Sequence, residues 1–258
     1  MKPFVSFEQI SQVFSRPDGS SLMALKDVSF DIGRHEFVAV VGPSGCGKST
    51  LLRLLSGLLM PTRGQVTLFG QPVTEPRDEV GIVFQKPTLL PWLNALENVV
   101  FPVRHKTGRV ARADYERARE LIAMVGLGDF CDRMPGELSG GMQQRLGIAR
   151  ALLLDPDVLL MDEPFSALDA LSREEMGFEL LRIWNERPKT VLFITHSITE
   201  AVLLSDRVLV MSERPGTLVS NIAIDLPRPR TVASIQEKRF HEYSSQIRDL
   251  IYRPHHAA

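Results

Sequence analysis

Alternating apolar and polar residues open the chain, and nearly continuous apolar runs follow them. Residues 4–7 and 24–30 alternate on either side of the turn-rich stretch 16–20, and this pattern predicts antiparallel strands. Residues 36–41 are almost entirely apolar and β-branched, which is typical of a strand buried on both faces. Similar runs predict further buried strands at residues 80–84, 157–161 and 190–195.

Apolar residues at helical spacing lie between these runs. They predict helices over residues 49–59, 111–125, 141–154 and 172–184. Strands that alternate with helices indicate an α/β domain with a parallel sheet. The stretch from about residue 86 to residue 154 lacks strand character, and we interpret it as a helical insertion into that domain.

The pattern changes again from Pro215 onward. Pro227 and Pro229 block regular strand pairing, so we interpret residues 226–230 as a linker. An amphipathic terminal helix is predicted beyond it by Ile235, Phe240, Tyr243, Ile247, Leu250 and Ile251. For His255 and His256 at the very end, a frayed terminus is favoured over a metal site.

Composition limits the class of protein. The 258 residues, 44% of them hydrophobic, predict a folded chain with one large domain or a core and a subdomain. A net charge of −1 removes overall basicity as an argument for a nucleic-acid partner. No apolar run approaches the ~18–20 residues of a membrane helix, and the first residues do not resemble a signal peptide. Cys46 and Cys131 are predicted to be free thiols of a cytoplasmic protein.

A phosphate-binding motif follows the predicted strand 36–41. Residues 42–49 fit G-x-x-x-x-G-K-[ST] at every fixed position, between a buried strand and a helix, and this context disfavours an ordinary glycine turn. Lys48 is expected to reach the β- and γ-phosphates of a nucleotide, and Ser49 to ligate Mg²⁺. A bulky thiol reagent on Cys46 is expected to block nucleotide entry. The expected nucleotide contacts are Gly42, Pro43, Ser44, Gly45, Cys46, Gly47, Lys48, Ser49 and Thr50.

Four polar residues follow the ends of other predicted strands, where ligands of parallel sheets bind. Asp162 is suited to hold Mg²⁺ and Glu163 to polarise the attacking water. His196 and Gln85 end two further strands, and Gln85 can meet the metal or the water. An acidic strand-to-loop transition or a loop histidine is the plain alternative for each residue taken singly.

A second glycine motif, at residues 138–145, opens a predicted helix. Ser139, Gly140 and Gly141 offer a hydroxyl, backbone donors and a helix N-terminus, which together make an anion site. Simple N-capping by Ser139 leaves the two glycines unexplained, since glycine weakens a helix start. The chain already has one phosphate loop, so this second site indicates the nucleotide of a partner subunit.

Taken in their order along the chain, these motifs resemble those of the nucleotide-binding subunit of ABC transporters. The counterparts of the family's Walker A, Q-loop, signature, Walker B, D-loop and H-loop lie at residues 42–50, 85, 138–142, 158–163, 166–169 and 196. Met142 stands where many members have glutamine. Phe14 stands at the position of the aromatic that stacks on adenine, where tyrosine is more usual. The resemblance covers residues 4–225.

This resemblance implies a fold and a mechanism. The fold is an α/β P-loop NTPase (RecA-like) core with an N-terminal antiparallel β subdomain and an inserted α-helical subdomain. The ATPase domain then spans 4–228, with the core at 4–87 and 155–225 and the helical subdomain at 88–154, and a helical extension follows at 229–258. A head-to-tail homodimer would bind two ATP molecules with Mg²⁺. Glu163 would be the general base, His196 the γ-phosphate sensor, and Asp169 would couple the two sites.

Further residues resemble the nitrate/sulfonate/taurine branch of importers, namely Leu89-Leu90-Pro91-Trp92 and the segments 214–216 and 225–230. The apolar stretch 86–93 is either a groove for the coupling helix of a permease or part of the packing of the helical subdomain. The implied partners are a second copy, membrane permease subunits and, through them, a substrate-binding protein, with the chain peripheral on the cytoplasmic side of the inner membrane. No long coiled coil fits before Ser139, which disfavours the DNA-maintenance relatives. A soluble ABC-type ATPase that assembles or regulates other proteins is the alternative.

Overall fold

The structure is a computed structural model that describes residues 3–166 and 168–252. Its contacts divide the chain into two units, one formed by the residues up to 77 and from 190 onward, the other by residues 78–189. His255 and His256 lie outside the described residues, as does Ala167 of the segment 166–169.

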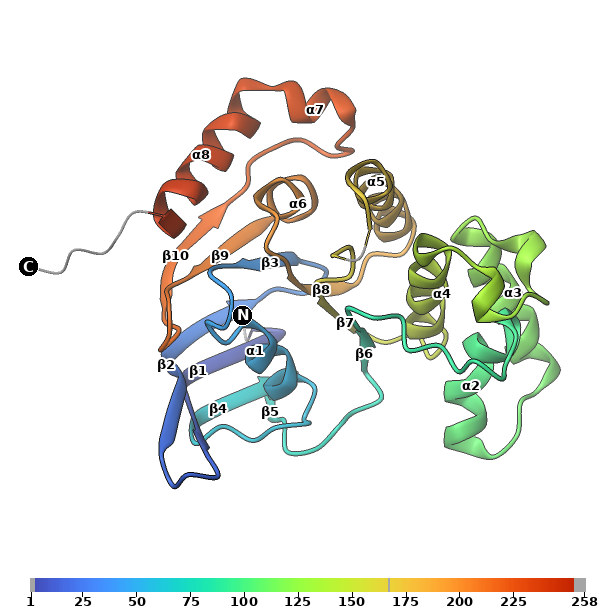
Figure 1. Cartoon of the computed structure of the whole chain (residues 1–258), viewed down its shortest axis with the longest axis horizontal. Helices are drawn as coiled ribbons and strands as arrows, with labels where there is room; N and C mark the ends of the chain where they lie inside the picture. The colour runs from blue at the N-terminus through green and yellow to red at the C-terminus, as the bar shows by residue number, and fades with distance from the viewer. Residues whose placement is uncertain (1–2, 167, 253–258) are drawn as a thin grey trace, which may run out of the picture. The chain divides into compact units, whose positions relative to one another are not determined.

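The first unit begins with an antiparallel sheet. Its strands are β1 (Val5–Ser15), β2 (Ser21–Ile32), β4 (Arg63–Leu68) and β5 (Gln71–Pro72), in the order β2-β1-β4-β5 (Figure 1). One face of β1 buries Val5, Phe7 and Ile10, and the ring of Phe7 stacks on that of Phe30 at 4.4 Å between centroids. The alternation in the sequence therefore predicted these first two strands correctly.

Parallel strands make the second layer of this unit. They are β3 (Phe37–Val41), β8 (Thr190–Ile194) and β9 (Arg207–Met211), with β10 (Leu218–Ala223) antiparallel at the edge, in the order β10-β9-β3-β8. Every residue of β3 and β8 is buried, as the continuous apolar runs predicted. The register pairs Val40 with Ile194, so β3 and β8 end at the same edge of the sheet.

The helices of the same unit in the described ranges are α1 (Lys48–Leu55), α6 (Ile198–Leu204), α7 (Val232–Gln236) and α8 (Lys238–Tyr252). The leucine pattern predicted that the first helix would reach residue 59, but it ends at Leu55. Gly57 there adopts a left-handed conformation at φ +72°, and Leu58 is exposed. The leucine periodicity alone did not predict that the helix ends at Leu55.

The second unit combines a parallel pair of strands with a group of helices. The strands are β6 (Val80–Val83) and β7 (Val158–Asp162), and the helices are α2 (Ala95–Thr107), α3 (Arg112–Met124), α4 (Gly140–Leu152) and α5 (Ala170–Glu186), with 3₁₀ turns at Gly128–Phe130 and Pro135–Glu137. Helix α2 packs on α3 and α4 (Figure 1). The sequence did not predict α2. Asn94 caps its start by accepting from the Glu97 N–H at 2.8 Å.

The segment 226–230 has no regular structure, as its prolines predicted, but hydrogen bonds and an ion pair fix its position. Arg230 is 4% exposed and donates to backbone carbonyls at the end of α6, and Arg228 pairs with Asp206 at 2.7 Å. Beyond this segment α8 packs on α6, within the same unit (Figure 1). No helix in the described ranges is long and apolar enough to cross a bilayer.

Candidate nucleotide-binding site

The glycine-rich loop 42–47 connects β3 to α1, as the sequence predicted. Gly47 precedes α1 with φ +103°, and a Cβ there would lie 2.6 Å from a methyl carbon of Leu25. Both the backbone conformation and the packing therefore require glycine. The loop places the N-terminus of α1, with its backbone donors, at the edge where β3 ends.

Lys48 lies inside this loop. Its side chain is largely buried, and its Nζ donates to the carbonyl oxygens of Gly42 at 2.9 Å and Pro43 at 3.0 Å. These carbonyls hold the ammonium group among the backbone groups that precede α1. Ser49 and Thr50 lie in the first turn of the helix, Ser49 exposed and Thr50 half-buried.

Cys46 is also buried, at 1% exposure, with its Sγ 4.0 Å from the Lys48 Nζ. Burial raises the pKa of the Cys46 thiol, and the charge of Lys48 offsets part of that rise. A thiol reagent is thus expected to reach Cys46 slowly. Cys46 and Cys131 are both free thiols, which confirms the prediction made from their number.

His196 leaves the sheet beside the loop. It follows β8, the parallel neighbour of β3, and the Thr195 N–H donates to the Val40 carbonyl at 3.2 Å. The Thr195 hydroxyl donates to the Glu200 carboxylate at 2.6 Å and accepts from the Ser197 N–H at 2.9 Å. These bonds fix the turn that carries the exposed imidazole of His196.

In the second unit, Gln85 follows β6, Asp162 is the last residue of β7, and Glu163 comes directly after it. These strands are parallel and pair Val83 with Met161, so both end at one edge. The Gln85 side-chain amide donates to the Ser166 hydroxyl at 3.0 Å. Glu163 has a left-handed backbone at φ +45°. Asp162 and Glu163 are both half-buried.

The signature residues begin α4. The Ser139 hydroxyl caps this helix by accepting from the Met142 N–H at 3.3 Å. Ser139, Gly140 and Gly141 line a cavity of about 370 Å³ together with Asp169. The Asp169 carboxylate accepts from the backbone N–H groups of Leu171 and Ser172 and so caps α5. Its hydrogen bonds with Ser172 lower the pKa of the Asp169 carboxyl.

The predicted site residues thus form two sets, each at the strand ends or helix ends of one unit. The set in the first unit is Phe14, Gly42, Pro43, Ser44, Gly45, Cys46, Gly47, Lys48, Ser49, Thr50 and His196. The set in the second unit is Gln85, Ser139, Gly140, Gly141, Asp162, Glu163 and Asp169. Phe14 lies on β1 opposite Leu22 and is half-buried.

Comparison with known proteins identifies the family. The ABC transporter family profile matches residues 25–166, more than half of the chain. The chain belongs to the ABC transporter family. It is 46% identical to an uncharacterized ABC transporter ATP-binding protein of Methanocaldococcus jannaschii, over 97% of this chain and 92% of that one. It is 45% identical to the taurine import ATP-binding protein TauB of Ruegeria pomeroyi, over 96% of this chain and 92% of that one.

A solved structure agrees with the assignment. A dimeric ATP-binding cassette in a post-hydrolysis state, bound to ADP and phosphate, matches with a TM-score of 0.74 and 33% identity, over 86% of this chain and 100% of that one. The predicted P-loop fold class is therefore confirmed, and so is the prediction of an ABC-type ATPase.

The donor set predicted for Mg²⁺ is a hydroxyl, an amide and a carboxylate, from Ser49, Gln85 and Asp162. Such hard oxygen ligands fit Mg²⁺. The described part of the chain contains no group of three or more His, Cys, Asp or Glu side chains arranged to hold a metal ion. Mg²⁺ bound with a nucleotide takes further oxygen ligands from the phosphates, so three protein ligands are enough to hold it in an ABC ATPase.

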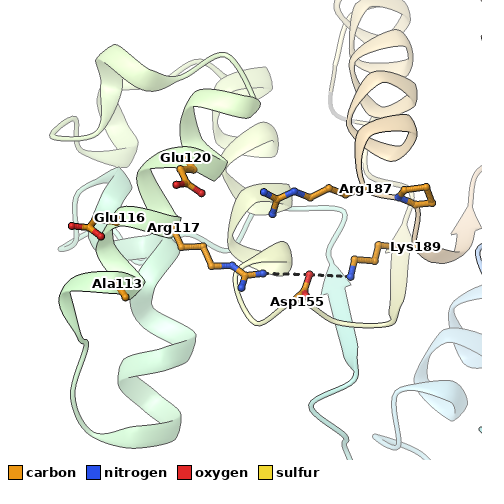
Figure 2. Close-up of a pocket in the computed structure, with 8 residues that line it drawn as sticks. Ala113, Glu116, Arg117, Glu120, Asp155, Arg187 and Lys189 are labelled. Carbon is orange, nitrogen blue, oxygen red and sulfur yellow. Dashed lines mark hydrogen bonds and ion pairs between the residues drawn. The ribbon is translucent and has the colours of Figure 1, made fainter.

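A larger cavity, of about 540 Å³, lies elsewhere in the second unit and contains none of the predicted site residues. Figure 2 shows Arg117 of α3 and Lys189 reaching the carboxylate of Asp155 from opposite sides. The distances are 3.3 Å from Arg117 and 3.0 Å from Lys189. The side chain of Arg187 points into the same cavity (Figure 2). Three basic and three acidic side chains line this cavity and balance in formal charge. The ion pairs of Asp155 there connect α3 to the segments before β7 and β8.

Sequence reasoning missed several residues that support the site of this ABC ATPase. Thr195 and Glu200 fix the turn at His196, and Arg214 donates to the Gly45 carbonyl. Residues 214–216 were noted only for their resemblance to one importer branch. Nothing in their spacing from the phosphate loop indicated a contact, since 169 residues separate Arg214 from Gly45.

Proposed function

We propose that this chain is the ATP-binding and ATP-hydrolysing subunit of an ABC importer for a small anion such as taurine, another aliphatic sulfonate or nitrate. The observation that carries the proposal is the phosphate loop between β3 and α1 in a chain that matches a taurine import ATP-binding protein over nearly its whole length. The identity of the solute rests on such relatives and on the resemblance of residues 89–92, 214–216 and 225–230 to one importer branch, because ATPase subunits do not touch the substrate.

Two copies act together in this proposal. Ser139, Gly140 and Gly141 present a hydroxyl and backbone donors at the start of α4, beside an open cavity. These donors suit the γ-phosphate of a nucleotide held by the partner copy, and a related cassette is dimeric with ADP and phosphate bound. Asp169 lines the same cavity, and in this proposal it couples the two nucleotide sites.

Hydrolysis in this proposal uses residues of both sets. Lys48 binds the β- and γ-phosphates, His196 contacts the γ-phosphate, and Glu163 accepts a proton from the attacking water. Ser49, Gln85 and Asp162 hold Mg²⁺, which offsets charge on the phosphate oxygens. Phe14 stacks on the adenine.

The permease is proposed to dock on residues 86–93. Trp92 is 70% exposed, and Asn98 holds the backbone around it by donating to the carbonyls of Leu90 at 3.1 Å and Leu93 at 2.8 Å. A rigid loop that presents an exposed tryptophan is typical of a protein interface. Held in this way, the chain is a peripheral protein on the cytoplasmic face of the plasma membrane, and a substrate-binding protein delivers the solute to the permease.

The Glu163→Gln substitution tests the catalytic assignment. Loss of the base is expected to lower steady-state ATP turnover by about 100-fold or more, while equilibrium binding of a fluorescent ATP analogue remains within about twofold of wild type. The matched control is Glu174→Gln, an exposed glutamate on α5 of the same unit. Equal turnover in wild type and Glu163→Gln contradicts the assignment.

The solute is tested in the complete complex. ATP turnover of the chain with its permease, in proteoliposomes with the binding protein, is expected to rise when taurine or a related sulfonate is added. Nitrate and bicarbonate serve as comparison solutes. Stimulation by none of these anions argues against an importer of small anions, and a chain that binds no permease supports the soluble alternative.

A further inference from the structure

The turn between β9 and β10 forms a rigid segment, residues 212–217. The Ser212 N–H donates to the Thr217 carbonyl at 3.0 Å, and the Ser212 hydroxyl accepts from the Thr217 N–H at 2.9 Å. Gly216 also pairs with β2, since its N–H donates to Ala24 at 2.9 Å and its carbonyl accepts from Lys26 at 3.0 Å. Backbone bonds on both sides therefore fix the segment.

This segment lies directly against the phosphate loop. A Cβ on Gly216 would lie 2.0 Å from the carbonyl oxygen of Cys46, so only glycine allows the approach. Two residues earlier, Arg214 donates from Nε at 3.0 Å and from Nη2 at 2.7 Å to the carbonyl oxygen of Gly45. Both donors of the guanidinium fork converge on one backbone oxygen of the loop.

The contact fixes the orientation of one peptide plane. In a trans peptide the C=O and the N–H point in opposite directions. With the Gly45 carbonyl held by Arg214, the Cys46 N–H points to the other side, where it donates to Pro43 at 3.4 Å. Gly45 and Gly47 both have left-handed conformations, and glycines lose more entropy on ordering than other residues. A contact that orders the loop beforehand lowers the entropy lost when a nucleotide binds.

We infer that Arg214 is a positioning residue for nucleotide binding, which holds the phosphate loop in the conformation that receives the nucleotide. This inference rests on the proposed function. It assigns to residues 214–216 a role in the ATP site.

The test compares Arg214→Gln and Arg214→Lys with wild type in the full chain. Arg214→Gln is expected to raise the Kd of an ATP analogue and the KM for ATP by about five- to twentyfold, with kcat nearly unchanged. Arg214→Lys keeps the charge but loses the fork, so it recovers only part of the affinity. The matched control is Arg239→Gln, an exposed arginine in the same unit, which should bind ATP as wild type does.

A second measurement separates positioning from charge. Burial raises the pKa of the Cys46 thiol and the Arg214 charge offsets a small part of this, so loss of the charge alone would slow alkylation of Cys46. A loosened loop instead exposes the thiol. Faster alkylation by iodoacetamide in Arg214→Gln, measured in a Cys131→Ser background without nucleotide, supports positioning.

The inference is overturned by equal affinities in wild type and Arg214→Gln, by full recovery in Arg214→Lys, or by slower alkylation of Cys46. The inference also fails if Arg214→Gln lowers the melting temperature of the nucleotide-free chain enough to account for the lost affinity. Arg214 would then only stabilise the fold. If wild type itself binds no ATP analogue, the proposed function fails instead.

Discussion

Glu163 has a left-handed backbone at φ +45° directly after β7. For a residue other than glycine this conformation costs about 1–2 kcal/mol. Such strain persists where the surrounding structure fixes the chain, and it gathers at functional sites. Here the Ser166 N–H donates to the Glu163 carbonyl at 3.1 Å and closes the turn, so the strain belongs to the turn that presents the proposed base.

Asp155 also has a left-handed backbone, at φ +55°, and its carboxylate forms ion pairs. A hydrogen bond from Lys189 lowers the pKa of the Asp155 carboxyl, and the charges of Lys189, Arg117 and Arg187 lower it further. The carboxylate joins α3 to the segment before β8 (Figure 2). Because it is more than half exposed, solvent weakens these pairs.

The Asp155→Asn substitution is expected to lower the free energy of unfolding by about 0.5 kcal/mol at pH 7. The folded-state pKa lies below that of the unfolded chain, so the stabilisation is complete above the unfolded value of about 3.9 and disappears as the pH falls through the folded value. Urea unfolding at a series of pH values measures this difference.

Asparagine tolerates the left-handed backbone, so the change isolates the charge. Asp129→Asn, an exposed change in the same unit, is the control. If the difference in free energy of unfolding between wild type and Asp155→Asn stays constant as the pH falls, the ion pairs of Asp155 do not stabilise the fold.

At the scale of elements, the end of α6 depends on a distant residue. Arg230 donates from Nη1 to the carbonyls of Val202, Leu203 and Ser205 at 3.0, 3.0 and 2.7 Å, and from Nη2 to those of Ile224 and Leu226. The last carbonyls of a helix have no partner within it, and here a guanidinium supplies one. Burial lowers the pKa of Arg230 to about 10, which leaves it charged at neutral pH.

The Arg230→Met substitution is expected to cost about 3 kcal/mol of stability, since it leaves buried carbonyls without donors. Chemical denaturation measures the loss. Arg239→Met, which removes an exposed arginine on α8, should change stability by less than about 0.5 kcal/mol. A loss below about 1 kcal/mol in Arg230→Met means that water replaces the donors and contradicts this role of Arg230.

At the scale of the whole molecule, the proposed function requires a second copy to complete the site at the signature residues. The Ser139→Arg substitution is expected to leave ATP-analogue binding to the monomer within about twofold, yet to reduce hydrolysis by about 100-fold, because the bulky side chain blocks the partner's phosphate. The matched control is Glu174→Arg, an exposed position on α5 of the same unit that does not line the cavity. Mixed dimers in which one Ser139→Arg copy leaves both sites fully active contradict the shared site.

The sequence by itself determined the elements with strong periodicity and the chemistry of the motifs. The buried strands, the phosphate loop and most helices of the second unit follow from apolar spacing and from residue types that bind phosphate. Helix α2 was not predicted because its start depends on an asparagine cap and Pro102 lies inside it. The domain boundaries at 4–228, 88–154 and 229–258 stay a prediction.

Only the tertiary structure decided which distant side chains hold these motifs in place. Arg214 donates to Gly45 and Arg230 donates to the end of α6, and nearer in the sequence Thr195 donates to Glu200. The first two contacts join segments far apart in the sequence, and such contacts form only when strands pair and bring their ends to one edge. Local periodicity reports which face of an element is buried, but it contains no information on which polar group a folded neighbour will offer. The composition predicted a chain without a membrane segment. The ABC ATPase fold explains how such a chain can energise transport through membrane partners.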